Sequence, residues 1–332
     1  MTEPIVRVRD LAVRYRTKEQ SLVHAVDGTS FDLERGKILA LIGESGCGKT
    51  TAAMSVLKLL PPNAEVVSGS VSFDGRNLLK ESERNLRTLR GRRIATIFQD
   101  PVAGLNPVIS VGDQVAETLT SHLEITKKEA KNRAVQILSS VGLSDPARVA
   151  KAYPFQLSGG MCQRVMIGIA TALDPDVLIA DEPTSALDVT VQAQILHQLD
   201  HLRRTRGTAI MLITHDFGVV AQMADAVAVM YAGRIIEQGD VDEMLGRPQH
   251  PYTHALLATL PRLDDTRGQL HAIPGNPPEM VEPAEHCPFI PRCSKVMNVC
   301  RQNPPPPLEE NENATHPVAC YNPVWQGDLD GY

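Results

Sequence analysis

A glycine-rich segment near the start of the chain constrains the fold more than any other feature. This segment, Gly43-Glu44-Ser45-Gly46-Cys47-Gly48-Lys49-Thr50, matches the pattern G-x-x-x-x-G-K-[ST] at every position. An apolar run, Ile38–Ile42, precedes it, and residues 50–60 have the pattern of a helix. A strand, a glycine turn and a helix in this order form an anion-binding site. The backbone N–H groups of the turn and the positive N-terminal end of the helix both face the anion.

The same motif predicts how a nucleotide would be held. Lys49 is placed to reach the β- and γ-phosphates, and the Thr50 hydroxyl to bind Mg²⁺. We interpret Cys47 as a small residue that fits the loop, with a redox switch as the alternative. The nucleotide contacts expected here are those of Gly43, Ser45, Gly46, Cys47, Gly48, Lys49, Thr50 and Thr51.

Alternating patterns along the chain predict a largely parallel α/β sheet. Residues 5–15 alternate apolar and polar as a half-buried strand does, and apolar runs return at 177–180 and 209–213. Residues 191–204 between these runs have a helical pattern, as have most residues from 101 to 154. Strands that alternate with helices indicate an α/β fold, and we interpret the stretch from residue 101 as a helical insertion.

Two acids directly follow the apolar run at 177–180. Asp181 is expected to hold Mg²⁺, directly or through water, and Glu182 to polarise the attacking water as a general base. Paired acids at the end of a strand also occur as an ordinary solvated terminus. The phosphate-binding motif upstream favours the catalytic interpretation.

A second glycine motif, Ser158-Gly159-Gly160, opens a predicted helix and provides another anion-binding end. One phosphate loop suffices for one nucleotide, so this motif is best explained if it covers a nucleotide bound to another subunit. Over roughly residues 5–250, the chain resembles the ABC ATPase family. The resemblance implies a P-loop NTPase core of the α/β class. It also implies a head-to-tail dimer with each ATP held between the two subunits.

The resemblance implies roles for further residues. Gln99 is similar to the glutamine that contacts Mg²⁺ or water and links the helical insertion to the core. His215 is similar to the histidine that contacts the γ-phosphate, and Tyr15 to the aromatic residue that stacks on adenine; a buried histidine and an ordinary strand aromatic are the plainer alternatives. Asp188 belongs to a loop, Ser185-Ala186-Leu187-Asp188, similar to the one that pairs across the dimer. ATP and Mg²⁺ are therefore the expected ligands, and ATP hydrolysis the expected reaction.

The composition changes after about residue 246, where prolines become dense and periodicity fades. Such a tail should bury little apolar surface by itself and needs another source of order. Four thiolates could supply that order by binding zinc or a [4Fe–4S] cluster: Cys287, Cys293, Cys300 and Cys320. Their separations are wider than the C-x₂₋₄-C pairs common in zinc sites, which favours the larger cluster; Zn²⁺ and free thiols are the alternatives. His286 and His316 are expected to be neighbours rather than ligands.

The tail also carries a more specific resemblance. His250-Pro251-Tyr252-Thr253, Ile273-Pro274-Gly275-Asn276-Pro277-Pro278 and the cysteine segments closely resemble the C-terminal extension of the oligopeptide and dipeptide subfamily of ABC importers. The resemblance favours the iron–sulfur cluster and implies a small metal-binding extension at residues 251–332. The ATPase domain would then span residues 1–250, with a helical subdomain at about 101–165.

The resemblance to this subfamily implies that ATP hydrolysis drives the import of di- or oligopeptides; nickel complexes and glutathione-like compounds are alternative cargoes. The implied partners are a second ATPase subunit (identical or related), two transmembrane permeases and an extracytoplasmic solute-binding protein. The expected location is peripheral, on the cytoplasmic face of the inner membrane.

Charge and hydropathy argue against a nucleic-acid-binding, a membrane-spanning and a secreted protein. The net charge of −6, without a visible concentration of Lys and Arg, predicts no nucleic-acid partner. No apolar run approaches the roughly 20 residues of a membrane span, and Met1-Thr2-Glu3-Pro4 lacks the pattern of a secretory signal. The alternatives are a soluble ABC ATPase of DNA repair or chromosome structure and a translation-associated ABC protein. The former usually carries long coiled-coil or zinc insertions and the latter two ATPase units, and neither feature is visible in the sequence.

Overall fold

The computed structural model describes residues 3–185, 187–259, 273–278, 280–281, 284–308 and 315–324. Contacts divide the chain into two compact units, each assembled from separate segments of the sequence. Among the described residues, the first unit contains 3–5, 33–38 and 74–213, and the second contains 6–32, 39–73 and those from 214 onward. No helix in the described part of the chain is long and apolar enough to span a membrane.

The first unit contains three parallel strands, β6 (Ile94–Ile97), β7 (Val177–Asp181) and β8 (Ala209–Ile213), with β7 in the middle. Every residue of β7 and β8 is buried. Continuous apolar runs of this kind are typical of parallel strands covered on both faces.

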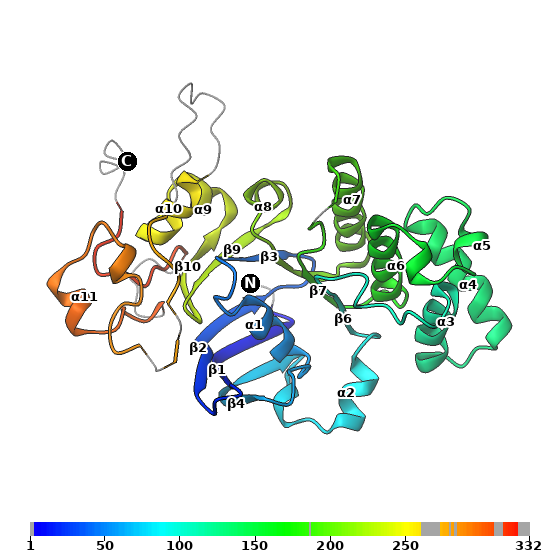
Figure 1. The fold of residues 1–332 in the computed structure, drawn as a ribbon, viewed down its shortest axis with the longest axis horizontal. Coiled ribbons are helices and arrows are strands. Elements are labelled where there is room, and N and C mark those ends of the chain that lie inside the picture. The colour runs from blue at the N-terminus through cyan, green and yellow to red at the C-terminus, as the bar shows by residue number, and fades with distance from the viewer. Residues whose placement is uncertain are drawn as a thin grey trace. The chain divides into compact units, whose positions relative to one another are not determined.

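The longer helices of the first unit begin at side chains that cap them. Ser110, Thr126, Ser158 and Asp188 each accept a hydrogen bond from the backbone N–H three residues later. They precede α3 (Val111–His122), α4 (Lys127–Ser140), α6 (Gly159–Thr171) and α7 (Val189–Arg206). The shorter elements are β5 (Arg76–Asn77), η1 (Leu78–Lys80), α2 (Glu83–Leu89), α5 (Pro146–Val149) and η2 (Pro154–Gln156). Helices α3, α4, α5 and α6 contact one another (green in Figure 1), so the predicted insertion is helical.

The second unit contains two groups of strands. β1 (Val6–Arg16) pairs antiparallel with β4 (Ala64–Phe73) and has β2 (Leu22–Leu33) on its other side. β3 (Ile38–Ile42) runs parallel to β9 (Ala226–Tyr231), which pairs antiparallel with β10 (Arg234–Asp240). The helices of this unit are α1 (Lys49–Val56), α8 (Phe217–Met223), α9 (Val241–Gly246), α10 (Pro251–Ala258), η3 (Ile290–Arg292) and α11 (Asn298–Gln302).

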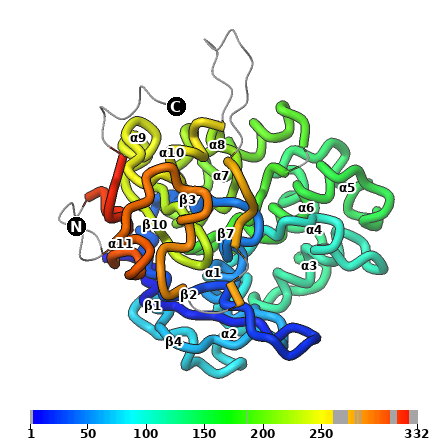
Figure 2. Tube along the Cα trace, turned by 60° about the vertical axis from the view of Figure 1, so that its left-hand side comes forward, coloured from blue at the N-terminus to red at the C-terminus, as the bar shows by residue number. Residues whose placement is uncertain are grey.

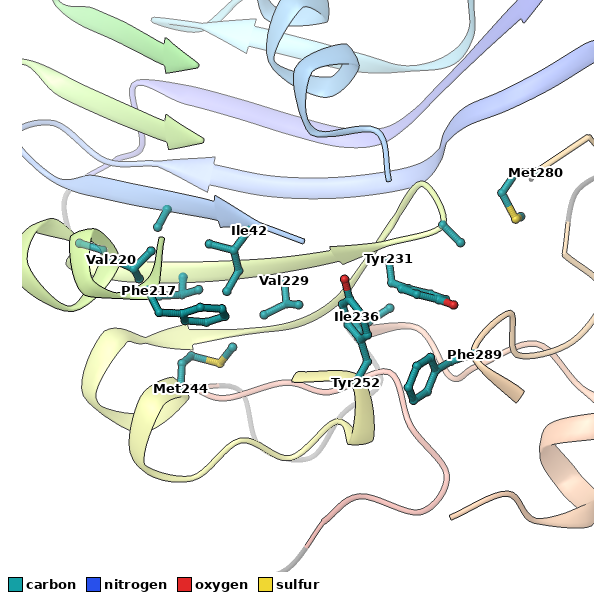
Figure 3. Close-up of a cluster of buried hydrophobic side chains, with 14 residues drawn as sticks. Ile42, Phe217, Val220, Val229, Tyr231, Ile236, Met244, Tyr252, Met280 and Phe289 are labelled. Carbon is teal, nitrogen blue, oxygen red and sulfur yellow. The ribbon is translucent and has the colours of Figure 1, made fainter. Parts of the chain in front are cut away.

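The tail buries large apolar side chains against the core of the second unit. Tyr252 is fully buried, and Phe289 is only 2% exposed. Their rings pack against Tyr231 of β9, with centroids 4.5 Å and 5.3 Å from the Tyr231 ring (Figure 3). The tail was expected to bury little apolar surface by itself, and these side chains are buried against the core strand β9. The tail contributes large side chains to a core shared with β9 and β10, and packing is one source of its order.

A buried carboxylate joins the tail to β10. Glu237 is fully buried and accepts hydrogen bonds from the backbone N–H of Gln249 (2.6 Å) and of His250 (2.9 Å), and pairs with Nε2 of His316 (2.8 Å). Beside it, the segment around Val318 pairs with β10 in an antiparallel bridge. Figures 1 and 2 both show the orange and red tail beside α9, α10 and β10.

The strands and helices predicted from periodicity are confirmed with small shifts of their ends. Residues 38–42, 177–180 and 209–213 form β3, β7 and β8, and residues 191–204 lie within α7. The domain boundaries at residues 250 and 165 stay predictions. The helix α10 was not predicted; Pro251 at its first position and the His250 side chain, which caps the N–H of Tyr252, start it.

Candidate functional site

The predicted phosphate-binding loop lies between β3 and α1 in the second unit. Gly48 has a φ of 106°, which is strained for any residue with a side chain, and an added Cβ would collide with the carbonyl oxygen of Ala25. Gly48 is also the N-cap of α1 and has no side chain to cap the helix. The first turn of α1 therefore presents backbone N–H groups that suit an anion.

Lys49 lies at the start of α1 with its side chain folded back along the loop. Its Nζ donates to the carbonyl oxygens of Gly43 (2.7 Å) and Glu44 (2.9 Å) and lies 3.7 Å from Sγ of Cys47. Lys49 is only 8% exposed, so its charge is held inside the loop by backbone dipoles. Burial raises the pKa of the Cys47 thiol, which agrees with the interpretation of Cys47 as a small apolar member of the loop.

Tyr15 and Thr51, both expected at the nucleotide, lie together. The Tyr15 hydroxyl is 3.0 Å from Oγ1 of Thr51, which joins the end of β1 to the first turn of α1. His215 follows β8 and is exposed, next to the buried Thr214 whose Oγ1 accepts from the N–H of Asp216. The plainer alternative of a buried histidine is therefore wrong for His215, and its contact with the γ-phosphate stays a prediction.

Glu44, the second residue of the loop, is held by two residues of the tail, Arg292 and Tyr252, to which the sequence assigned no role at the loop. Arg292 forms two parallel hydrogen bonds with the Glu44 carboxylate, of 2.6 Å and 2.8 Å. The Glu44 backbone N–H donates to the Tyr252 hydroxyl at 2.9 Å. An arginine between two of the tail cysteines was the only sequence signal, and it does not identify a partner so far away along the chain.

In the first unit, the predicted acids stand at one edge of the parallel sheet. Asp181 ends β7 and is 3% exposed, and Gln99 is exposed two residues after the end of β6. Because neighbouring parallel strands run in the same direction, these ends lie along the same sheet edge. Glu182 has a φ of 46°, a conformation that non-glycine residues rarely adopt. Its backbone is fixed there by a 2.9 Å bond from its N–H to the carbonyl of Ile213. Strain of this kind is commonly found at active sites.

The second glycine motif lies at the exposed N-terminus of α6. Ser158 and Gly159 are exposed, and the Ser158 hydroxyl accepts from the N–H of Met161 at 3.3 Å. The carboxylate of Asp188 caps α7 by accepting from the N–H of Val191 at 2.9 Å. Within the loop expected to pair across a dimer, Ala186 lies outside the described residues. The buried Gln163, which the sequence analysis missed, donates to the carbonyl of Pro183 at 2.7 Å and so links α6 to the segment after Glu182.

The four tail cysteines line one small cavity together with Phe289, Ile290 and Ala319, among others. Backbone N–H groups of Lys295 and Asn322 donate to the sulfur atoms of Cys293 and Cys320, at 3.4 Å and 3.3 Å. Burial raises the pKa of Cys320 to about 12 and also raises those of Cys287 and Cys293. In the described part of the chain, however, no three His, Cys, Asp or Glu side chains are grouped to hold a metal ion, so the expected metal-binding extension is not shown.

His316 pairs with two glutamates, and its expected place as a neighbour rather than a ligand of the cysteines stays a prediction. Its Nε2 lies 2.8 Å from Glu237, and its Nδ1 is 4.0 Å from Glu243. His286 is exposed.

Comparisons with known families match both parts of the chain. The ABC transporter family matches residues 26–185, and the C-terminal region of oligopeptide/dipeptide transporters matches residues 236–300. A solved dimeric ATP-binding cassette in a post-hydrolysis state, bound to ADP and Pi, is 25% identical with a TM-score of 0.65. It covers 71% of this chain, and the chain covers 98% of it.

Two curated relatives are similar to the chain over almost their whole length. The dipeptide transport ATP-binding protein DppD of Bacillus subtilis is 45% identical over 320 residues, which are 96% of this chain and 95% of DppD. The oligopeptide transport ATP-binding protein OppD of Escherichia coli is 44% identical over 322 residues, which are 97% of this chain and 94% of OppD. The chain therefore belongs to the ABC transporter family, in its branch of oligopeptide and dipeptide transport ATP-binding proteins.

Proposed function

We propose that this chain is the ATP-hydrolysing subunit that powers import of short peptides by a membrane ABC transporter. The observation that carries the proposal is the combination of a complete set of ATPase motifs with a tail of the oligopeptide/dipeptide type. The names of the curated relatives, dipeptide and oligopeptide transport ATP-binding proteins, support peptides as the cargo. Nickel complexes and glutathione-like compounds are the alternative cargoes.

ATP is bound in this proposal by the loop at the start of α1. The Lys49 ammonium donates to the carbonyl oxygens of Gly43 and Glu44. When ATP binds, it would donate to the phosphate oxygens instead. Tyr15 would stack on adenine, and Thr50, Gln99 and Asp181 would hold Mg²⁺, which supplies charge neutralisation at the β- and γ-phosphates. Hydroxyl, amide and carboxylate oxygens are the ligands that Mg²⁺ prefers.

Hydrolysis is assigned to Glu182 and His215. Glu182 would accept a proton from the attacking water. The strained backbone at Glu182 sets the direction in which this side chain leaves the backbone. His215 would contact the γ-phosphate. The exposed N-terminus of α6, with Ser158, Gly159 and Gly160, would cover the ATP of a second ATPase subunit, and Asp188 would lie at the dimer contact.

The partners follow from this role. Two transmembrane permeases would carry the peptide, and closure of the ATPase dimer would move permease helices docked near Gln99. An extracytoplasmic solute-binding protein would deliver the peptide. The ATPase would sit peripherally on the cytoplasmic face of the inner membrane. No nucleic-acid partner is proposed, in keeping with a net charge of −6.

The tail cysteines fit a [4Fe–4S] cluster better than a single ion. Four thiols face one cavity with apolar side chains in its wall, and two of the sulfur atoms accept backbone N–H bonds, as cluster sulfurs commonly do. Cys287, Cys293, Cys300 and Cys320 would be the ligands. Bound there, the cluster would supply iron–thiolate bonds that cross-link separate segments of the tail.

Peptide uptake tests the cargo and the catalytic assignment together. Cells that depend on this transporter should take up a labelled dipeptide with the wild-type chain and lose uptake with Glu182→Gln. Competition by unlabelled di- and oligopeptides, but not by nickel salts or glutathione, is expected. Uptake of nickel that peptides do not inhibit would contradict the cargo, and normal uptake with Glu182→Gln would contradict the general base.

Iron, sulfide and zinc analysis of protein purified without oxygen tests the cluster. About four iron and four sulfide per chain are expected, together with a visible absorption band. Cys320→Ser should lower the iron content, whereas Cys162→Ser, a buried thiol in the first unit, should leave it unchanged. Zinc alone, or no metal at all, would contradict the cluster.

A further inference from the structure

The phosphate-binding loop and the cysteine-bearing tail meet at a partly buried ion pair. Arg292 donates from Nη1 to one Glu44 oxygen at 2.6 Å and from Nη2 to the other at 2.8 Å. The Arg292 side chain is 2% exposed and that of Glu44 24% exposed. Two parallel, charge-assisted bonds at a partly buried site hold both groups in a defined geometry.

The tail holds Arg292 firmly in place for this contact. Its Nε donates to the carbonyl of Pro274 at 2.9 Å, and its guanidinium lies 5.9 Å from the centre of the Tyr231 ring. Arg292 ends the short helix η3, directly before Cys293. The guanidinium therefore depends on the fold of the tail for its position.

Glu44 is held on three sides, and one of these is the loop's own lysine. Its carboxylate meets Arg292, its N–H donates to the hydroxyl of Tyr252, and its carbonyl accepts from Nζ of Lys49. The tail therefore fixes the position of Glu44, which stands near the start of the phosphate-binding loop. A shift of Glu44 would move the carbonyls that hold the lysine.

Charge gives a second reason for the pairing. A carboxylate in a loop that binds a polyanion repels the ligand unless a cation compensates it. Arg292 supplies that cation from the side of the tail. We infer that Arg292 is a positioning residue of the phosphate-binding loop, which neutralises and anchors Glu44 so that nucleotide affinity depends on the folded tail.

Nucleotide binding to the purified full chain tests this inference, with the fluorescent analogue mant-ATP as the probe. Arg292→Ala should raise its Kd about tenfold, since it frees Glu44 and leaves its charge uncompensated. In steady-state ATP hydrolysis KM should rise more than kcat falls. The double variant Arg292→Ala/Glu44→Gln should regain most of the lost affinity, because it also removes the anion. Arg301→Ala, on the exposed side of α11, is the matched control and should bind like wild type.

Two outcomes would overturn the inference. One is a Kd for Arg292→Ala within twofold of the control in a folded chain, as judged by circular dichroism. The other is a double variant that binds no better than Arg292→Ala, as expected if Arg292 only stabilised the tail. If Arg292→Ala does not fold, Arg292→Lys is decisive. It keeps the charge but not the two parallel bonds, and should bind between wild type and the loss expected for alanine; binding equal to wild type would refute the role of the paired geometry.

Thermodynamic reciprocity provides an independent measurement. If the tail favours nucleotide binding, bound nucleotide must stabilise the tail by the same factor. Hydrogen exchange of the backbone at residues 287–293 should therefore slow when mant-ATP binds to the wild-type chain, and slow less in Glu44→Gln. A hydrogen-exchange rate at these residues that does not change when mant-ATP binds would contradict the coupling. These measurements use the isolated subunit, so their failure would leave the proposed peptide import intact.

Discussion

The buried Glu237 offers the sharpest test of how the tail is attached to the core. Its two oxygens accept from two donors, the backbone N–H groups of Gln249 and His250, and one of the oxygens also lies 2.8 Å from Nε2 of His316. Glu237→Gln keeps the shape of the side chain but replaces one acceptor oxygen with an N–H₂ donor. At least one of these donors then faces another donor in a site without exposure to water.

The expected loss can be worked from these contacts. A buried donor left without a partner costs about 1–3 kcal/mol, and the remaining bonds lose the strengthening that an ionised acceptor gives. Together these amount to about 3 kcal/mol of unfolding free energy, or an apparent Tm lower by about 6–12 °C for a unit of this size. Limited proteolysis should also cut the tail faster in this variant.

Thermal denaturation of Glu237→Gln beside Glu243→Gln is the assay. Glu243 is about half exposed and lies 4.0 Å from the other nitrogen of His316, so the control makes the same chemical change outside the buried site. A melting temperature of Glu237→Gln within 1 °C of the control would refute the reasoning, since the buried carboxylate would then contribute nothing specific.

Three further changes give expected outcomes. Lys49→Ala should abolish mant-ATP binding, because it removes the cation that faces the phosphates, and measurable affinity near wild type would contradict that role. Glu182→Gln should bind ATP but stop hydrolysis; phosphate release at the wild-type rate would exclude Glu182 as the base. Burial lowers the pKa of His250 to about 4, so between about pH 6.5 and 4 the unfolded chain takes up a proton that the folded chain does not. The free energy of unfolding should be highest above about pH 6.5 and fall by on the order of 3 kcal/mol by pH 4. His250→Asn retains an acceptor for the N–H of Tyr252 and should remove this part of the pH dependence. An unchanged dependence of stability on pH in this variant would contradict the assignment.

Local sequence patterns predicted the elements that carry the ATPase motifs. The runs that became β3, β7 and β8 are apolar at nearly every position, which leaves few alternatives to a buried strand. The glycine loop could also be predicted from a short stretch of sequence, because the spacing of its glycines indicates its backbone conformation. The caps at Ser158 and Asp188 had a sequence signal as well, since Ser and Asp are favoured directly before a helix.

The contacts of the tail had no such signal. Met280 and Phe289 come from segments without helical or strand periodicity, yet both are buried in the core that contains Tyr231. The partner of Arg292 lies 248 residues away, and a single sequence does not show which distant acid an arginine meets. Packing and pairing over such separations are decided by the whole fold, which is why composition alone did not show where the tail packs.

The distance along the chain between Glu44 and Arg292 also has a consequence for biosynthesis. The glycine loop leaves the ribosome early, but the arginine that anchors it is 248 residues further on. At about 5–20 residues per second, translation needs about 12–50 s to cover this separation. During that interval the nascent loop has its lysine and its glycines but not its anchor. A nascent chain is therefore expected to acquire full nucleotide affinity only after the tail has been synthesised and has folded against β9 and β10.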